Sequence, residues 1–524
     1  MNRNDNFLNP ILYPVGIQSF EKLRSEGYLY VDKTPQIYRL IRMKIPYFLS
    51  RPRRFGKSLL LSTLEAYFLG KKDLFRGLAI EQWEQDWKTY PVLHLSLNAE
   101  KYETVEDLQK ILEDQLMVWE KEYDSQPTID SYSVRFKNVI QKAYEKTGLR
   151  VVVLVDEYDK PLLRALHNEE LQTRFRNLLT AFYTVLKDAD PYLHFVFITG
   201  VTKFAQMGIF SNLNHLKDIS FLPEFADLCG LTRQEIEENF STGIHTLATN
   251  HKMTYEELLN EMTCMYDGYR FSPHNNIGMY NPFSVLNALR DGLFEHYWFA
   301  SGTPTYLVEM LKKTDFDIRD LEGVEVDGSS LMNDHADVNN PIPMIYQSGY
   351  LTIKEYDEEF RAYTLGFPNE EVKYGFLSFA APYYESVPPE STSFHIGRFV
   401  KELRAGKIEA FLTRLRAFFA DFPYELNDKT ERHYQVVFYL VFKLMGQFTQ
   451  TEIRSARGRA DAVVWTPDYI YVFEFKLNGT AQEALRQIDE KGYLIPYTAD
   501  TRQLVKVGVN FDHEERNVGE WMIG

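Results

Sequence analysis

Cysteine is scarce in this chain. Among its 524 residues only Cys229 and Cys264 occur, and neither belongs to a Cys-x-x-Cys pair. A disulfide scaffold needs several cysteines and a zinc-thiolate site needs closely spaced ones, so the sequence excludes both. The twelve histidines also lack the spacing of metal ligands such as His-x-x-x-His. The chemistry of this protein therefore has to come from other residue types.

Positive charge is also in deficit. Lys and Arg together number 58 against 74 for Asp and Glu, which gives a formal net charge of −16 at pH 7. The molecule as a whole therefore does not attract nucleic acid or anionic lipid. Any surface that binds DNA or RNA has to be a local one.

Long hydrophobic runs are missing as well. No stretch of roughly 18 consecutive apolar residues occurs, and the segment MNRNDNFLNPILYPVG contains no apolar signal core. Two isolated cysteines suit a reducing compartment. We therefore expect a cytoplasmic protein with no membrane partner.

Strand-like and helix-like segments alternate regularly from residue 17 to residue 198. The segments IPYFLS, PVLHLSL, VVVLVDE and HFVFITG are almost continuously apolar, as are strands buried on both faces of a sheet. Amphipathic stretches with apolar residues three and four positions apart separate them. This pattern predicts an α/β fold with a parallel sheet and crossover helices.

The segment RPRRFGKS resembles a phosphate-binding loop between the strand IPYFLS and the periodic helix KSLLLSTLEAYFLG. In such a loop, backbone N–H groups and a Lys bind phosphate oxygens, while a Ser hydroxyl binds Mg²⁺. Gly56, Lys57 and Ser58 supply these parts, although Arg51 stands where the first glycine is usual. For these three residues alone, a basic turn is the better interpretation.

The strand VVVLVDEYD strengthens the interpretation as a nucleotide site. It ends in Asp156 and Glu157, which are suited to organising Mg²⁺ and to polarising the attacking water. The next strand ends with Thr199 and Thr202, which either sense the γ-phosphate or simply cap the strand. Arg270, in MYDGYRF, either contacts the γ-phosphate or serves packing, and packing is the better interpretation.

The segment GRADAVVWTPDYIYVFEFKLNG predicts a β-hairpin near the C-terminus. A turn from Thr466 to Tyr469 would pair Trp465 with Ile470 and place Asp461 opposite Glu474. Side chains at opposite positions of neighbouring strands lie roughly 4.5–5.5 Å apart. Two carboxylates that close repel each other unless a cation lies between them. The hairpin therefore predicts a Mg²⁺ site.

Lys476 shares a strand face with Glu474 and is suited to orienting or deprotonating a water molecule. A local basic strip precedes the acids and consists of Arg454, Arg457 and Arg459. Cationic side chains of this kind bind the phosphates of a polynucleotide. The alternative is a surface hairpin that carries ordinary charges.

Several motifs resemble the AAA-ATPase-like family of bacterial proteins, which is typically joined to a C-terminal PD-(D/E)XK nuclease-like domain. They are YPVGIQSFEKLRSEGYLYVDKT, RPRRFGKS, VDEYDKPL, ITGVTKF and LKDIS. The resemblance implies that Arg51 is the usual form of the loop, and that the arginines either add charge beside the phosphates or face solvent. It implies that YVDKT holds the adenine or the ribose. The expected nucleotide contacts are Arg53, Arg54, Phe55, Gly56, Lys57, Ser58, Leu59, Asp156 and Thr199.

The resemblance to the PD-(D/E)XK superfamily maps its catalytic Asp, Glu and Lys onto Asp461, Glu474 and Lys476. It also suggests Glu431 as a further acid and Gln487 as an auxiliary polar group. Glu431 is equally explained as a helix-start acid favoured by the helix dipole, and Gln487 as a solvent-facing residue. Folds of this kind also serve as non-catalytic modules.

A chain of 524 residues is too long for a single hydrophobic core, so several domains are expected. We expect an AAA-like P-loop ATPase core over 1–215, a helical lid over 216–300, a winged-helix-like module over 301–378, a linker over 379–398 and a restriction-endonuclease-like α/β domain over 399–524.

These features predict a protein that binds and hydrolyses ATP and whose nucleotide state controls a Mg²⁺-dependent nuclease acting on DNA or RNA. One alternative is a nucleotide-dependent switch whose C-terminal domain binds a partner or a nucleic acid without cutting. Another is a protein-remodelling ATPase. A homo-oligomer or a protein partner is compatible with each.

Overall fold

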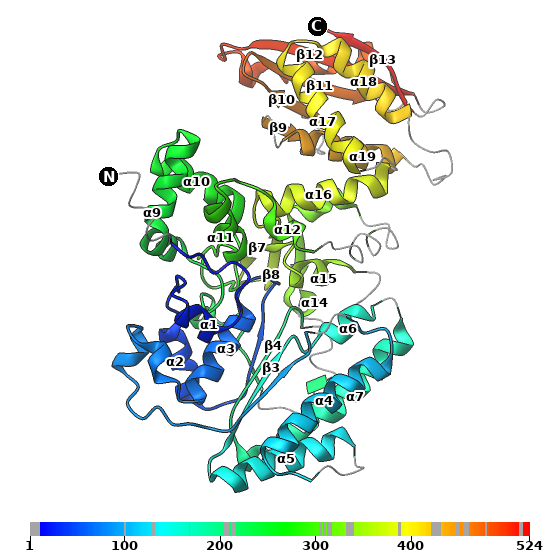
Figure 1. Cartoon of the computed structure of the whole chain (residues 1–524). Helices are drawn as coiled ribbons and strands as arrows, with labels where there is room; N and C mark the ends of the chain where they lie inside the picture. Colours follow the sequence, from blue (N-terminus) through cyan, green and yellow to red (C-terminus); the bar gives the residue numbers. More distant parts are fainter. Residues whose placement is uncertain are drawn as a thin grey trace. The chain divides into compact units, whose positions relative to one another are not determined.

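A computed structural model of the chain describes residues 11–98, 101–126, 131–166, 168–203, 209–210, 216–302, 307, 311, 317–331, 340–385, 389–420, 431–446, 450–453, 461–476, 479–512 and 517–524. The chain forms two compact units (Figure 1). The first comprises Met1–Asp315 and Leu321–Val372, and the second comprises Phe316–Asp320 and Lys373–Gly524. Within the described part of the chain, no helix combines the length and the apolar character needed to cross a membrane.

A five-stranded parallel sheet lies at the centre of the first unit, in the order β2-β3-β4-β1-β5. The strands are β1 (Tyr47–Ser50), β2 (Val92–Ser96), β3 (Val151–Asp156), β4 (Leu193–Gly200) and β5 (Lys217–Asp218). The four apolar segments expected to be strands are β1 to β4, so the predicted parallel sheet is confirmed. Every residue of β3 is buried, as its continuous apolar pattern predicted.

The strand register places the candidate nucleotide residues at one edge of this sheet. Leu49 pairs with Thr199, and Ser96 pairs with Asp156. Because the strands are parallel, the carboxyl ends of β1, β3 and β4 meet at this edge, where ligands of open α/β sheets bind.

Helices cover both faces of the sheet. In Figure 1 the blue helices α1 to α3 and the cyan helices α4, α5 and α7 flank the strands from opposite sides. Helix α4 starts at a capping box between Thr104 and Asp107 and buries Leu108, Leu112 and Leu116 at helical spacing. The helices of this region are α1 (Phe20–Ser25), α2 (Thr34–Met43), α3 (Lys57–Phe68), α4 (Val105–Glu122), α5 (Tyr132–Thr147), α6 (Lys160–Arg164) and α7 (Glu169–Asp188).

The rest of the first unit contains a helical group and a small sheet. Four helices, which we call the lid helices, follow the parallel sheet: α9 (Arg233–His251), α10 (Tyr255–Tyr266), α11 (Pro282–Asp291) and α12 (Tyr297–Ala300). Helices α9, α10 and α11 share a core of buried side chains that includes Phe240, Met262 and Val285. A three-stranded antiparallel sheet in the order β6-β8-β7 follows. Its region comprises β6 (Val324–Asp327), α14 (Gly328–Leu331), α15 (Ile342–Gln347), β7 (Thr352–Asp357) and β8 (Ala362–Gly366).

The segment expected to be a linker is largely helical, so that prediction was wrong. Helix α16 covers Glu370–Glu385, and α17 covers Pro389–Arg404. Composition was misleading here, because Pro389 occupies the first helical position, where proline is tolerated. The informative signal was the helical spacing of four buried residues, Ile396, Phe399, Val400 and Leu403.

A second five-stranded sheet, in the order β13-β12-β11-β10-β9, forms the centre of the second unit. Strands β11 and β12 are parallel, and the other pairs are antiparallel. Its elements after α17 are α18 (Ile408–Ala420), α19 (Glu431–Met445), β9 (Gln450–Ile453), β10 (Ala462–Trp465), β11 (Tyr469–Lys476), α20 (Ala481–Glu490), β12 (Gln503–Asp512) and β13 (Asn517–Ile523). Helix α20 packs closely on β12, where a Cβ on Gly508 would lie 2.3 Å from the carbonyl oxygen of Ala481.

Candidate functional sites

The segment RPRRFGKS connects β1 to α3 as a tight loop. Gly56 has a φ of 89° and is the N-cap of α3, which begins at Lys57. A left-handed conformation at this position favours glycine, because a side chain there would be strained. The loop therefore presents the N-terminus of a twelve-residue helix, with its unpaired N–H groups, at the carboxyl edge of the sheet.

The Lys57 side chain folds back over its own loop. Its ammonium donates hydrogen bonds to the carbonyl oxygens of Arg51 at 2.9 Å and Pro52 at 3.0 Å, and the residue is 5% exposed. Neutral carbonyls are weaker partners for an ammonium than charged oxygens are. The Lys57 ammonium is thus held at the loop by two carbonyl oxygens that a bound anion can replace as its partners.

Ser58, Asp156 and Thr199 come together although they lie on three different elements. Ser58 Oγ donates to Asp156 Oδ2 at 2.6 Å, and Thr199 Oγ1 donates to Asp156 Oδ1 at 2.7 Å. Asp156 is 4% exposed and Thr199 is fully buried. Hydroxyl and carboxylate oxygens are the donors that Mg²⁺ prefers, so these residues fit that ion.

Glu157 follows at the end of β3 with a φ of 54°. Its carboxylate lies 3.2 Å from Lys160 Nζ, and Lys160 also donates to Asn98. The side chain of Glu157 is 24% exposed and lines a large cavity beside the loop. Sequence reasoning missed Lys160, which follows β3, and Asn98, which follows β2. Their signal was position, because residues just after the carboxyl ends of parallel strands line the ligand site of such a sheet.

Asp159 is a further residue that sequence reasoning missed. It is fully buried and accepts hydrogen bonds from the backbone N–H of Val201 and from the N–H and hydroxyl of Thr202. Burial raises the pKa of this carboxyl. Thr202 therefore helps to fix the loop after β4, which is the capping role that was one of its two interpretations.

Two cavities meet at the start of α3. The larger one has a volume of about 820 Å³ and is lined by polar residues that include Arg54, Lys57, Ser58 and Glu157. The smaller one, of about 100 Å³, is mostly apolar. The two share five lining residues: Pro14, Gly56, Leu59, Pro282 and Leu286. A cavity lined by charged residues thus adjoins an apolar one at the helix N-terminus.

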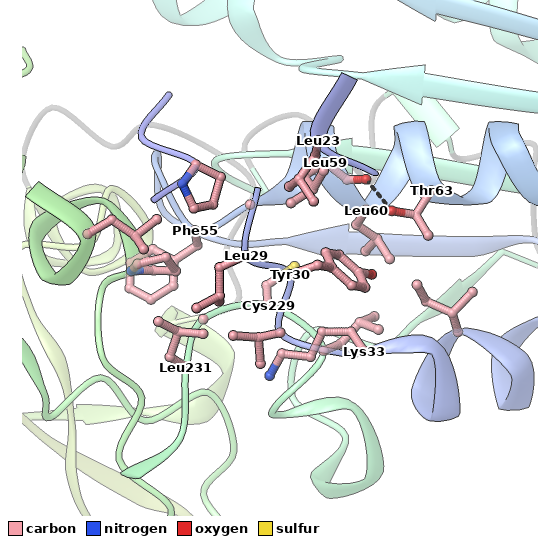
Figure 2. A pocket seen from close by; sticks show the side chains of 18 of the residues that line it. Leu23, Leu29, Tyr30, Lys33, Phe55, Leu59, Leu60, Thr63, Cys229 and Leu231 are labelled. Atoms are coloured by element: carbon pink, nitrogen blue, oxygen red, sulfur yellow. Dashed lines mark hydrogen bonds between the residues drawn. The ribbon is translucent and has the colours of Figure 1, made fainter. Parts of the chain in front are cut away.

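The smaller cavity brings together distant parts of the chain. Figure 2 shows leucine side chains from separate segments around it, together with Tyr30, Phe55 and Thr63. Lys33 also lines it, but its ammonium is bound to Glu235 at 2.6 Å and to the carbonyl oxygen of Asp227 at 2.8 Å. The YVDKT segment therefore forms one wall and is tied to α9, the first lid helix.

In the second unit, the hairpin has the register that the sequence predicted. Trp465 pairs with Ile470 and Ala462 with Phe473, so Asp461 comes beside Glu474. Asp461 Oδ2 accepts a hydrogen bond of 2.8 Å from the backbone N–H of Phe475. Burial raises the pKa of Asp461.

Glu474 is 3% exposed, and its two oxygens differ. Oε1 lies 3.3 Å from Lys476 Nζ and accepts a bond from Gln487, whereas Oε2 has no partner among the described residues. Burial, together with the nearby charge of Asp461, raises the pKa of Glu474 to about 7. An unpaired buried carboxylate oxygen beside a second carboxylate fits a divalent cation.

Comparison with known proteins gives a family match for each of the two regions that contain these sites. Residues 14–210 match the family model described as "Predicted AAA-ATPase", and residues 429–521 match that of the "PD-(D/E)XK nuclease superfamily". The "Uncharacterized protein in vnfD 5'region" of Azotobacter chroococcum mcd 1 is 34% identical over 517 residues, which is 96% of this chain and 97% of that protein. The chain belongs to the AAA-ATPase-like family. Its C-terminal domain is of the PD-(D/E)XK nuclease superfamily.

The first arginine of the AAA-ATPase-like loop does not lie beside the phosphate chamber. Arg51 is 2% exposed and donates to the carbonyl oxygens of Ser220 at 2.8 Å and Phe225 at 3.0 Å. Its guanidinium also lies 4.2 Å from the ring centroid of Phe271. The interpretation that Arg51 adds charge beside the phosphates, or faces solvent, was therefore wrong, because the residue is buried inside the first unit and does not line the larger cavity.

Arg53 and Phe55 also attach the loop to later parts of the first unit. Arg53 stacks over Trp298 at 4.7 Å and donates to Gly302 and to the hydroxyl of Tyr350. The Phe55 ring meets that of Tyr269 edge-on at 4.7 Å between centroids. Arg53 still lines the larger cavity and Phe55 the smaller one, so both remain near the expected nucleotide.

Gln487 joins the nuclease-like site from α20. It accepts a 2.5 Å hydrogen bond from Lys476 and donates to Glu474 and to the hydroxyl of Tyr493. Tyr493 was missed, since it follows α20 without a motif. The described residues contain no group of three or more His, Cys, Asp or Glu side chains at metal-binding distance. The side chain of Glu431 and all of Arg454, Arg457 and Arg459 lie outside the described residues.

Proposed function

We propose that the first unit binds and hydrolyses ATP. The observation that carries this proposal is that the two cavities share the lining residues Gly56 and Leu59, directly beside the Ser58–Asp156 hydrogen bond. The charged chamber suits a triphosphate at a helix N-terminus. The apolar cavity beside Tyr30 suits the base. The nucleotide contacts of this proposal are Arg53, Arg54, Phe55, Gly56, Lys57, Ser58, Leu59, Asp156 and Thr199.

Each residue has a chemical task in the proposed hydrolysis. Lys57 exchanges its carbonyl partners for phosphate oxygens. Ser58 and Asp156 would hold Mg²⁺, which would supply positive charge against the triphosphate. Glu157 takes the proton of the attacking water once its carboxylate separates from Lys160. Thr199 keeps the Asp156 carboxylate oriented through its 2.7 Å hydrogen bond.

We further propose that the second unit cleaves phosphodiester bonds of DNA or RNA. Asp461 and Glu474 would hold Mg²⁺, which polarises the scissile phosphate. Lys476, held by Gln487 at 2.5 Å, orients or deprotonates the attacking water. The unpaired Oε2 of Glu474 and its raised pKa support this assignment, because a cation at that position would remove the repulsion between the two acids.

The nucleotide state is proposed to control cleavage. The boundary between the two units falls inside α16, between Val372 and Lys373. Glu371, in the first turn of that helix, accepts a hydrogen bond of 2.6 Å from the N–H of Trp298. Trp298 in turn donates to the carbonyl oxygen of Arg53 in the phosphate loop. These contacts connect the nucleotide loop to the helix that leads into the second unit.

The test is cleavage of plasmid DNA, single-stranded DNA and RNA by the full chain with Mg²⁺ or Mn²⁺, with and without ATP. Cleavage should require the metal and disappear in Asp461→Ala, whereas Lys57→Ala should weaken or deregulate it. The matched control is Asp489→Asn, which replaces an exposed acid of α20 that is paired with Lys506. If ATP is hydrolysed and no polynucleotide is cut, the nuclease proposal fails and a switch or a remodelling ATPase takes its place.

A further inference from the structure

The three arginines of the phosphate loop have different surroundings. Arg51 and Arg53 donate to backbone carbonyls of the first unit, as described above. Arg54 is exposed and forms no hydrogen bond or ion pair with the described residues. It lines the large cavity together with Lys57, Ser58 and Glu157. Of the three, Arg54 is therefore the one whose guanidinium has no hydrogen-bond partner among the described residues and is free to bind a phosphate.

The backbone and a neighbouring ring hold Arg54 in this position. Its φ of 67° lies in the left-handed region, which residues other than glycine rarely adopt and which is often found at functional sites. The guanidinium lies 4.9 Å from the ring centroid of Phe283. Phe283 lies in the first turn of α11, and its N–H donates to the capping side chain of Asn281 at 2.9 Å. Arg54 is thus placed in the cavity by both its loop and a lid helix.

Other cations near the cavity are differently placed. Lys57 and Lys160 already have partners in the loop and at Glu157. Arg270 donates to the carbonyl oxygen of Lys354 at 2.6 Å, which supports its packing role. Arg164 is exposed on α6 and also lines the cavity, but its backbone is an ordinary helix and none of the described aromatic rings holds it. Arg54 alone among these cations is held at the cavity by an aromatic ring while it forms no hydrogen bond or ion pair with the described residues.

We propose that Arg54 is a catalytic residue of ATP hydrolysis that acts within its own chain. This inference rests on the proposed ATPase function. Its guanidinium binds γ-phosphate oxygens as water attacks the phosphorus, the bond to the β-phosphate oxygen breaks and ADP leaves. The proton of the water passes to Glu157. Because Arg54 belongs to the phosphate loop itself, the positive charge that stabilises the transition state needs no neighbouring subunit.

The first test compares Arg54→Ala and Arg54→Lys with the unmodified chain. Since arginines in this role contribute about 10³- to 10⁵-fold to kcat, Arg54→Ala should lose about 10³-fold or more, while ADP affinity changes by less than about threefold. Binding of ADP with aluminium fluoride, a transition-state mimic, should be lost. Arg54→Lys should recover little, because an ammonium lacks the planar fork of donors. Arg174→Ala, an exposed arginine of α7, is the matched control.

The second test separates action within one chain from action between chains. Arg54→Ala and Lys57→Ala proteins are mixed, and phosphate release is measured. Action within one chain predicts no recovery, since each protein lacks a part of its own site. Recovery of about a quarter of normal activity would assign Arg54 to a neighbouring copy and overturn the inference.

Two failures can be distinguished. A chain that hydrolyses ATP normally after Arg54→Ala overturns this inference and leaves the proposed ATPase intact. An unmodified chain that neither binds nor hydrolyses ATP overturns both. Because Arg54 is exposed and unpaired among the described residues, its replacement should not change the thermal unfolding midpoint, which serves as the check on folding.

Discussion

Ser58 Oγ donates a hydrogen bond of 2.6 Å to Asp156 Oδ2, although 98 positions separate the two residues in the chain. The pair joins the start of α3 to the end of β3. Ser58→Ala removes a metal-binding oxygen while leaving the helix intact, so we expect Mg²⁺-dependent phosphate release to fall by about 100-fold or more. Ser58→Thr, which keeps the hydroxyl, should retain most of the activity.

The control for that prediction lies on the same helix. Ser62 Oγ accepts a hydrogen bond from the N–H of Phe20 and does not line the large cavity. Ser62→Ala should lower the unfolding midpoint slightly and leave phosphate release within about twofold of normal. Equal losses in Ser58→Ala and Ser62→Ala would show that the hydroxyl of Ser58 acts only through the stability of α3.

A second prediction concerns the metal and pH dependence of the Glu474 site. The folded pKa of Glu474, about 7, is above the ordinary value of 4.5. Without metal, folding stability should therefore fall as pH rises from about 4.5 to about 7, because the unfolded chain has already lost the proton that the folded chain retains. Mg²⁺ binds the ionised form, so its stabilising effect should be larger at about pH 8 than at about pH 6.

Thermal unfolding of the full chain with EDTA and then with Mg²⁺ measures this difference. Glu474→Gln removes the charge and should abolish the contribution of this site at both pH values, while the contribution of the Ser58–Asp156 site stays. A metal effect of equal size in Glu474→Gln and in the unmodified chain would show that Glu474 does not bind the cation.

A third prediction concerns Glu371. Burial raises its pKa to about 8, and its carboxyl accepts bonds from the hydroxyl of Ser284 at 2.8 Å and the N–H of Trp298. Since the folded pKa is above the unfolded one, this group removes stability as pH rises from about 4.5 to about 8. Glu371→Gln should abolish that loss, so its unfolding midpoint should rise relative to the unmodified chain over this range.

The slope of this difference is at most about 1.4 kcal/mol per pH unit for one group. Melting curves at several pH values between about 5 and 9 give the difference directly. Glu370→Gln, at the neighbouring position, is the control for the loss of one acidic side chain from the first turn of α16. A constant difference between Glu371→Gln and the unmodified chain would mean that Glu371 ionises normally in the folded protein.

A fourth prediction follows from the burial of Arg51. Arg51→Met keeps much of the side-chain volume but leaves the carbonyl oxygens of Ser220 and Phe225 without their donor. We expect this to lower the free energy of unfolding by about 2–5 kcal/mol. Differential scanning calorimetry should show an earlier transition of the first unit, whereas Arg54→Ala should not. If Arg51→Met leaves this transition unchanged but weakens ATP binding, Arg51 contacts the nucleotide and does not mainly stabilise the fold.

The parts of this structure that sequence analysis predicted are those whose information is local. Strands β3 and β4 are recognisable because burial on both faces makes them almost continuously apolar, whereas the edge strand β2 is buried at alternate residues. The hairpin register follows from the turn alone, and counting back from Trp465 and Ile470 placed Asp461 beside Glu474. Local pairing rules suffice when both partners lie within a single hairpin.

The surroundings of the arginines depend on distant parts of the chain instead. The carbonyl partners of Arg51 lie 169 and 174 positions away, and Trp298 lies 245 positions from Arg53. Backbone carbonyls carry no sequence signal, so no motif near the loop could reveal that two of its three arginines donate to carbonyl oxygens of the first unit.

Because the phosphate loop is attached to later residues, the chain can be truncated at few positions without loss of folding. A fragment that ends at residue 210 or 215 would expose Arg51 and Phe55 without Ser220, Phe225 or Tyr269. Such a fragment should not fold by itself. Autonomous folding requires the chain through Val372, and recombination between relatives should exchange the nucleotide-binding core together with its lid.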